Sequence, residues 1–424
     1  MIEKILSALM ALNIETYAVS ETQTQSAEAF FVRRRLDLQR STRLTDYSVT
    51  VCRPFERDGA RMLGSCAVPV YPGMDEDELR EALASTYHAA SLVCNPYYEL
   101  YAGEREDFVP SRSAFAGKTP EENLRETADA LFAADVREDV FLNSAEIFAT
   151  RKLNRVVNSR GVDVSWESCQ VQGEYVAQCV APADVETHHQ FLFLEPDAAA
   201  LRAEVETALA QTRDRASASA PPRAGEYTVI LSAEHMSTLL SYYTDHASAG
   251  LIYQKYSDYA VGMAVQGDNI RGDALTIVLK ATQPYDPEGI PLRDRTLMEG
   301  GVLRAIQAGS RFAYYLGIEP TGAYRSIEVP VGDAPLAELK AQPHLHIVSF
   351  SDFQVDTFSG HFGGEIRLAY LYDGEQTRVV TGGSVNGSLL KAQEHMVFSR
   401  ERYKTAGYDG PFAVAIQNVA VAGE

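Results

Sequence analysis

The chain has 424 residues, of which 46% are hydrophobic and 23% are charged, a composition typical of a folded globular protein. Its 58 acidic residues outnumber its 38 basic ones, and the net charge of −20 repels nucleic-acid phosphate and anionic lipid. This length exceeds what one hydrophobic core usually organises. We therefore expect two domains, and no binding to nucleic acid or membrane.

The cellular compartment is indicated by what the chain lacks. No apolar run approaches the roughly 20 residues that span a bilayer, and Met1–Leu12 is typical of a short amphipathic helix rather than a signal peptide. The five cysteines form no C-x-x-C pair and end at Cys179, so neither a disulfide framework nor a zinc ribbon is indicated. We expect a cytoplasmic protein.

The clearest domain boundary is a stretch of small residues with a proline pair, which follows a charged helix from Pro196 to about Arg213. It predicts an N-terminal α+β domain over 1–215, a linker over 216–225 and a C-terminal domain over 226–424. In the N-terminal domain, capping boxes at Asp75 and Thr119 open two helices that we expect on a mixed or antiparallel sheet. Its strands are expected at Ala29–Leu38, Tyr47–Cys52, Met62–Val70, Phe141–Ala149, Leu153–Asn158, Val162–Gln170 and Tyr175–Val180.

The C-terminal domain is expected to be dominated by antiparallel sheet. Its two predicted helices run from Ser232 to about Ala249 and near Ser388–Phe398, among short strands bounded by glycine. Apolar residues recur on the first helix at the spacing i, i+3, i+4 and i+7, which indicates one buried face. They are Met236, Leu239, Leu240 and Tyr243.

The sequence of this helix, VILSAEHMSTLLSYYTDH, is similar to the helix that opens the C-terminal domain of the TldD/PmbA family, the "modulator of DNA gyrase" peptidase-related proteins. Three further segments resemble parts of that family: Ser144–Trp166, Ala281–Ser326 and the end of the chain. They follow one another in the family's order. The resemblance therefore extends over nearly the whole chain.

The zinc-bearing members of the family carry an H-E-x-x-x-H motif on this helix and a cysteine late in the C-terminal domain. Aligned on Leu239 and Leu240, this chain has Ser241 at the first histidine, Tyr242 at the glutamate and His246 at the second histidine. No cysteine follows Cys179, and a zinc site needs about three protein ligands. The resemblance therefore implies a metal-free PmbA/TldE-type subunit, with zinc only in a partner.

The resemblance also implies a function and partners. It implies a non-catalytic subunit of a TldD/TldE-type peptidase that processes unfolded or leader-bearing peptides, homodimeric when isolated and paired with a zinc-bearing TldD-type homologue in the cell. Two tyrosine-rich segments, Leu251–Tyr259 and Arg311–Leu316, are candidates for the interface, although aromatic residues also fill a domain's own core. The candidate residues of a peptide groove are Asp245, His246, Asp286, Gly289, Thr321 and Gly322.

Other interpretations stay open at this point. The chain is alternatively a self-sufficient metallopeptidase with an unrecognised site, or a protein-binding modulator of another enzyme. His344 and His346 share one face of an expected strand and are candidates for an unrelated metal site with His361, although ordinary hydrogen bonds are the more frequent role. Pro284–Gly289 is typical of a turn with Asx hydrogen bonding rather than of paired catalytic acids.

Overall fold

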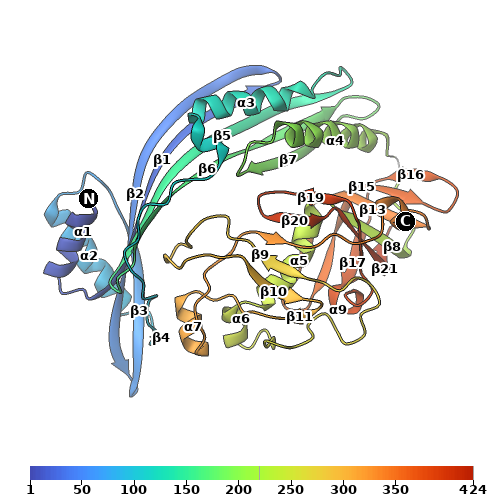
Figure 1. Ribbon diagram of the computed structural model, residues 1–424. Coiled ribbons are helices and arrows are strands. Elements are labelled where there is room, and N and C mark those ends of the chain that lie inside the picture. Colours follow the sequence, from blue (N-terminus) through green and yellow to red (C-terminus); the bar gives the residue numbers. More distant parts are fainter. Residues whose placement is uncertain (219, 424) are drawn as a thin grey trace.

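The structure, a computed structural model, describes residues 1–218 and 220–423 and contains three β-sheets with helices packed against them (Figure 1). The predicted α+β class is confirmed. One sheet uses strands from the first half of the chain, and the other two use strands from the second half. The long strands of the first sheet bend into an arch over the second half (Figure 1).

The first sheet has seven strands in the order β4-β3-β2-β1-β5-β6-β7, and all neighbouring pairs are antiparallel. This agrees with the helices on antiparallel sheet expected for the N-terminal half. The strands are β1 (Thr16–Val32), β2 (Arg35–Arg57), β3 (Ala60–Val70), β4 (Asn95–Pro96), β5 (Val140–Asn158), β6 (Asp163–Cys179) and β7 (Val185–Phe193).

One strand predicted for this sheet, Ala29–Leu38, is wrong because the chain reverses in its middle. Arg33 has a φ of 56° and forms a tight turn with Arg34, so the segment is divided between β1 and β2. The guanidinium of Arg33 lies 3.2 Å from the centroid of the Phe141 ring, which holds the turn in place. Arginine is not a typical turn residue, so the sequence carries no signal for this hairpin.

Helices cover one face of this sheet. Val19, Ala27 and Ala29 of β1 contact the two helix pairs and are even numbers of residues apart, so both pairs lie on the same side. None of the helices in the described part of the chain is both long and apolar enough to cross a membrane. They are α1 (Ile2–Ala11), α2 (Glu76–Ala90), the 3₁₀ turn η1 (Ala114–Gly117), α3 (Pro120–Ala133) and α4 (Ala198–Ser217).

The starts of these helices follow local sequence signals. Both predicted capping boxes are present, at Asp75 before α2 and at Thr119 before α3, each with reciprocal side-chain and backbone hydrogen bonds.

Helix α4 runs to Ser217, two residues into the predicted linker 216–225. Residue 219 of that linker, and residue 424 at the end of the predicted C-terminal domain, lie outside the described residues.

Two sheets form the second half. The six-stranded sheet has the order β11-β10-β9-β12-β20-β19. The eight-stranded sheet has the order β13-β8-β21-β17-β15-β14, with β16 paired to β15 and β18 paired to β21 outside this path. β13 also pairs with β15, so five strands of the larger sheet close into a ring. The strands are β8 (Gly225–Ser232), β9 (Ile277–Leu279), β10 (Arg295–Glu299), β11 (Val302–Leu303), β12 (Ile327–Glu328), β13 (His344–Phe350), β14 (Gln354–Val355), β15 (His361–Tyr372), β16 (Thr377–Val380), β17 (Ser384–Ser388), β18 (Val397–Phe398), β19 (Arg402–Lys404), β20 (Tyr408–Pro411) and β21 (Ala413–Ala422).

The helices of the second half differ from the two predicted ones. The helix expected from Ser232 is interrupted after His246, because Ser248 takes an extended conformation and caps a separate short helix. The helix expected near Ser388–Phe398 has only four residues, because the chain then leaves to pair with β21. The observed helices are α5 (Glu234–His246), α6 (Ala249–Tyr253), α7 (Ser310–Leu316), α8 (Leu336–Leu339) and α9 (Leu389–Ala392).

The two halves of the chain meet at a buried aromatic contact. Trp166 on the concave side of the arch packs against Tyr285, with ring centroids 5.6 Å apart. The hydroxyl of Tyr285 donates to Glu106 at 2.7 Å, which anchors the tyrosine end of the contact. Gly289 nearby allows close approach, since an added Cβ would lie 2.5 Å from Val162. This contact is one of several that join the second half to the arch, together with the aromatic pair Tyr98–Tyr315 and the hydrogen bond from Tyr370 to Asp214.

Trp166 is the single tryptophan of the chain, so its fluorescence reports this contact. We expect Tyr285→Ala to expose the indole, shift its emission to the red and lower the free energy of unfolding by about 3 kcal/mol. The control is Tyr256→Ala, which removes a ring that is 56% exposed and should change neither quantity. Unchanged emission in the Tyr285 variant would contradict the arrangement of the two halves.

Candidate functional site

Helix α5 follows strand β8 through one strained residue, Ala233. Its φ of 54° and ψ of −123° are rare for a residue with a side chain. The N–H of Ala233 donates to the carbonyl of Phe412 at 2.8 Å, and that of Met236 donates to the carbonyl of Ala233 at 3.1 Å. This sharp turn sends α5 directly back against the sheet that β8 belongs to.

The predicted apolar stripe of α5 is buried and fixes the rotation of the helix. Met236, Leu239 and Leu240 have no exposed surface, and Tyr243 is 1% exposed within the largest core cluster. The hydroxyl of Tyr243 donates to Gln393 at 2.9 Å, which satisfies its one polar atom. With this face fixed, every other position on α5 has a determined direction.

A polar stripe of α5 lines a groove of about 340 Å³, which we call the α5 groove. Ser237, Ser241, Thr244 and Asp245 form its helical wall. The opposite wall comes from Gln307, from the segment 324–327 and from Thr405 and Gly407. Of the predicted groove residues, only Asp245 lines it. Ser237, Ser241 and Thr244 were not among the predicted groove residues. Their polar spacing of i, i+4 and i+7 is the sequence signal for this wall.

His246 points away from the α5 groove. Its ring is 5% exposed and lies between Tyr242, at 4.3 Å between centroids, and Tyr259, at 5.1 Å. Its Nε2 donates to the carbonyl of Thr357, so the other ring nitrogen, Nδ1, carries no proton in the neutral ring. Nδ1 is buried and has no hydrogen-bond partner among the described residues. His246 therefore holds the loop at Thr357 to the helix.

The three positions aligned with the zinc motif face different directions. Ser241 lines the groove, Tyr242 is 3% exposed in the core, and His246 faces the loop at Thr357. Among the described residues, no group of three or more His, Cys, Asp and Glu side chains is placed to hold a metal ion. A serine, a tyrosine and one histidine do not supply the three protein ligands that a zinc site needs.

Asp245 sits at the edge of the groove beside His246. Burial raises the pKa of its carboxyl group, and the neighbouring imidazole opposes that shift. No hydrogen bond ties it to the Asp286 region. Asp245 is thus the one predicted acid whose side chain is both partly desolvated and open to the groove.

Asp286, predicted to form an Asx turn, does so. Its Oδ1 accepts hydrogen bonds from the N–H groups of Glu288 at 2.8 Å and Ile290 at 2.9 Å, and its Oδ2 from Ala323 at 3.2 Å. Burial raises its pKa, and these backbone bonds oppose the shift. The carboxyl is 1% exposed, so it organises the loop and offers no free acid to a substrate.

Thr321 and Gly322 belong to the same loop cluster. Thr321 Oγ1 accepts from the N–H of Ala308 at 2.9 Å, and the N–H groups of both residues donate to the Ala308 carbonyl. Gly322 has a φ of 82°, and an added Cβ would lie 2.6 Å from Leu292. The structure therefore brings Asp286, Thr321 and Gly322 together. Gly289, whose N–H donates to the Asp286 carbonyl at 3.0 Å, joins this loop cluster to the first sheet, and Asp245 lies apart at the groove.

The histidines considered for a separate metal site do not converge. His344 and His346 lie on β13 as expected, opposite Tyr372 and Tyr370 of β15. His346 Nε2 pairs with the hydroxyl of Ser232 at 2.9 Å, and His344 Nδ1 with the carbonyl of Gln342 at 2.8 Å. His361 begins β15, roughly 30 Å along the strand from His346 at about 3.3 Å per residue. The structure separates the three residues.

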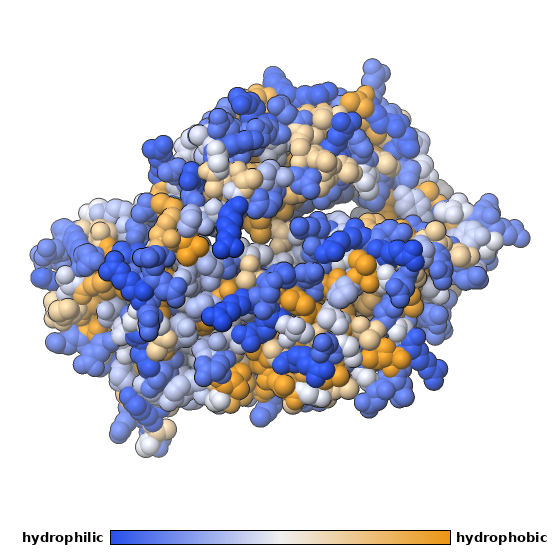
Figure 2. Space-filling view, in the orientation of Figure 1, coloured by the Kyte–Doolittle hydropathy of each residue, from blue (hydrophilic) through white to orange (hydrophobic). Residues whose placement is uncertain are grey.

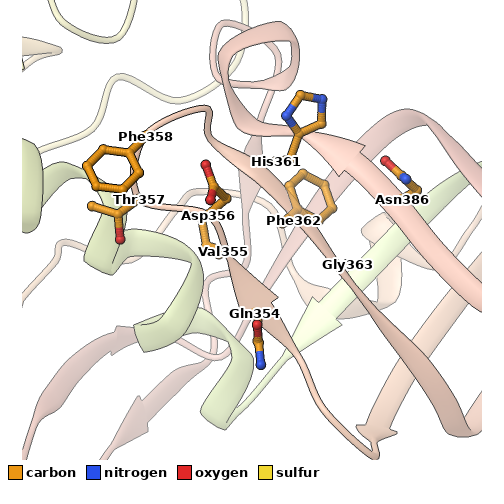
Figure 3. A pocket seen from close by; sticks show the side chains of 9 residues that line it. All are labelled: Gln354, Val355, Asp356, Thr357, Phe358, His361, Phe362, Gly363 and Asn386. Atoms are coloured by element: carbon orange, nitrogen blue, oxygen red, sulfur yellow. The ribbon is translucent and has the colours of Figure 1, made fainter. Parts of the chain in front are cut away.

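A second hollow of about 460 Å³ lies at the loop that His246 holds (Figure 3). Thr357 and Phe358 form one side, and His361 and Asn386 stand on neighbouring strands at the other (Figure 3). Phe358 is 58% exposed, and its ring packs on Tyr256 at 5.0 Å. The loop is therefore joined both to the helix and to the surface.

The tyrosine-rich segments lie partly on the surface. Tyr256 and Tyr314 are 56% and 46% exposed, whereas Tyr259 is buried. In Figure 2 apolar residues gather along the lower edge of the second half, the region where Figure 1 places α6 and α7. These segments thus contribute both to the core and to an exposed aromatic surface.

Comparison with known proteins gives a family match over the second half of the chain. Residues 224–423 match the family model described as "PmbA/TldA metallopeptidase C-terminal domain". A protein named "Metalloprotease" from Methanothermobacter thermautotrophicus is 26% identical over 204 residues. That match covers 42% of this chain and 43% of the relative, so the chain spans less than half of the relative's length.

Three solved structures share the fold at sequence identities of 15–16%. A protein described as a modulator of DNA gyrase from Thermotoga maritima and TldE from Thermococcus kodakarensis each have a TM-score of 0.76, over 99% of this chain and 100% of theirs. A modulator of DNA gyrase from Bacteroides thetaiotaomicron has a TM-score of 0.77, over 100% of this chain and 98% of its own. The likeness extends across both halves of the fold.

His246 provides a test of the site as described. We expect His246→Ala to lower the free energy of unfolding by about 2–4 kcal/mol, because it opens a cavity between two tyrosines and leaves the Thr357 carbonyl unpaired. His188→Ala, at a side chain that is 51% exposed, should stay within about 0.5 kcal/mol of the wild type.

Urea unfolding measures both variants, and the wild type is measured with and without a chelator. The chelator should have no effect, because His246 is held by a carbonyl rather than by a metal ion. A wild type destabilised by the chelator, or a fully stable His246 variant, would contradict the assignment.

Proposed function

The second half of the chain belongs to the PmbA/TldD family, and on that premise we propose that this protein is a non-catalytic, TldE-like subunit of a TldD/TldE-type peptidase in the cytoplasm. The family match agrees with the family predicted from the sequence. In this proposal the protein binds unfolded or leader-bearing peptides and completes the assembly. A zinc-bearing homologue supplies the hydrolytic chemistry.

One observation carries the proposal, namely the chemistry of the side chains that α5 presents. Ser241 and His246 have the same five-residue spacing as the two histidines of the H-E-x-x-x-H motif, but serine replaces the first histidine and the buried Tyr242 replaces the glutamate. The buried stripe prevents the helix from rotating to bring other side chains to the groove. The helix that bears the motif in zinc-containing relatives therefore presents hydroxyls and one carboxyl here.

The α5 groove supports a role in holding peptide. Its walls offer the hydroxyl oxygens of Ser237 and Ser241 as acceptors, since both hydroxyls donate to carbonyls of their own helix. The carboxyl of Asp245 and the side chain of Arg325 also line the groove. Such groups make hydrogen bonds with main-chain amides without selecting one sequence. This fits a subunit that holds unfolded chains of varied sequence.

The exposed aromatic surface supports a role in assembly. Tyr253, Tyr256, Tyr314 and Phe358 are each at least 37% exposed, and exposed apolar clusters of this kind mark interaction surfaces. Tyrosine and phenylalanine are also enriched in the buried centre of protein interfaces. We propose that this surface contacts the zinc-bearing homologue in the cell and a second copy of the chain when the protein is isolated.

A second candidate is a metallopeptidase active on its own, which the name of the 26% identical relative favours. A peptidase that is active on its own needs a metal site or an activated nucleophile, whereas a non-catalytic subunit needs neither. The Ser232–His346 pair is the buried hydroxyl–imidazole contact nearest to α5, but Ser232 is 2% exposed and no substrate reaches it. The ligand set described above therefore favours the non-catalytic role.

Peptidase assays separate the two candidates. An unfolded protein substrate is incubated with the pure protein, with a purified zinc-bearing homologue, and with both together. We expect no cleavage by this protein alone and cleavage by the mixture, because only the partner activates water. Light scattering is measured on the protein alone and on the mixture. The isolated protein should be a dimer.

The test variant is Tyr256→Ser, which removes one exposed ring from the aromatic surface and should weaken the mixed complex without changing the fold. Chelator-sensitive cleavage by the pure protein would overturn the proposed role. A stable monomer that forms no complex with the homologue would equally overturn the proposed assembly.

A further inference from the structure

A basic hollow of about 520 Å³ lies on the outer face of the closed ring of strands, and we define it by His361, Asn386, Lys391, His395, Gln417 and Asn418. None of these residues belongs to the α5 groove. His361 and Asn386 also line the hollow in Figure 3, so the two hollows adjoin and form one longer groove. The basic hollow is therefore an extension of the surface next to the loop held by His246.

The register of four strands builds its floor. Asn386 of β17 pairs with Ala420 of β21, which in turn pairs with Glu226 of β8, and cross-strand partners share a face. On β15, His361 lies two residues from Gly363, the partner of Asn386, so it shares that face too. The small side chain of Ala420 leaves the middle of this floor open.

Two irregular segments form the walls. Lys391 on α9 and His395, three residues beyond the end of this helix, both line one side of the hollow. On the other side, the pairing of β21 with β8 slips between Ile416 and Val419, and the bulge leaves Gln417 and Asn418 exposed. Asn418 has a φ of 56°. Bulges of this kind re-aim side chains and are frequent next to binding sites.

The hollow lacks the negative charge of the whole protein, because with histidine counted as neutral Lys391 and Glu226 balance each other, against −20 for the chain. Three basic side chains meet here in a chain with a net charge of −20, and no ion pair of the described residues uses any of them. The three amide side chains add further donors. The one carboxylate that lines the hollow, Glu226, is three strands from His361, about 14 Å at roughly 4.8 Å per strand. Asp356 of the adjoining hollow lies nearer, and His361 Nδ1 contacts Ser359 Oγ at 2.9 Å, which donates to Asp356. The hollow thus collects donors for an anion.

We propose that the basic hollow binds a carboxylate group of an extended peptide. Lys391, His361 and His395 surround the carboxylate. The side-chain amides of Asn386 and Asn418 donate hydrogen bonds to its remaining lone pairs. Charge-assisted hydrogen bonds of this kind are the strong ones. The peptide then continues past His361 into the hollow of Figure 3, where Phe358 and Val355 offer apolar contacts. The anion follows from the hollow alone, and the choice of a peptide rests on the proposed function.

Calorimetric titration of the full-length protein tests this with three forms of one unstructured peptide. The forms are a free C-terminal carboxylate, a C-terminal amide, and a C-terminal amide with two glutamates near the end. We expect the plain amide to bind about tenfold more weakly than the free acid, because it loses one charge-assisted contact. The glutamate form shows whether a side-chain carboxylate serves as well as the chain terminus.

Two variants locate the site. Lys391→Met removes the charge at similar volume and should weaken binding of the free acid about tenfold, and Ala420→Leu should weaken it by filling the floor. The control is Lys255→Met, at an exposed lysine outside the hollow, which should bind like the wild type.

Equal affinity for acid and plain amide, no binding of any peptide, or equal effects of the Lys391 and Lys255 variants would overturn the proposal. Binding of inorganic phosphate without binding of peptide would do the same. Because the titration uses the isolated chain, its outcome is independent of whether the protein pairs with a zinc-bearing homologue.

Discussion

The arrangement of the second half depends on the burial of one face of α5. Met236, Leu239, Leu240 and Tyr243 are locked between the two sheets, and rotating the helix would move about four large side chains out of a packed core at roughly 2 kcal/mol or more each. The strained turn at Ala233 fixes where the helix starts. Together they determine which side chains meet the groove and which meet the loop at Thr357.

From this constraint the functional surfaces follow in order. On one side α5 presents hydroxyls and Asp245 to a groove, and on another side His246 holds the loop that lines the hollow of Figure 3. The nearby basic hollow uses a bulge in β21 rather than α5 itself. The helix is thus a scaffold that positions binding surfaces, which is consistent with the proposed role of a subunit that holds peptides for a zinc-bearing partner.

The sequence predicted the features that depend on neighbouring residues. These are the capping boxes at Asp75 and Thr119, the apolar stripe of α5, the Asx turn at Asp286 and the family of the second half. It did not predict the hairpin at Arg33, where the left-handed residue is not glycine or asparagine. The basic hollow could not be predicted from the sequence either. Its residues on β8, β15, β17 and β21 come together only through the strand register.

The central claim is that the helix at the family's metal-binding position holds no metal in this chain. Elemental analysis of the full-length protein, purified without chelator and with zinc in the growth medium, tests it most directly. The account predicts well below one zinc per chain, and no difference between the wild type and a folded His246→Gln variant. One tightly held zinc ion per chain that is lost in that variant would contradict it.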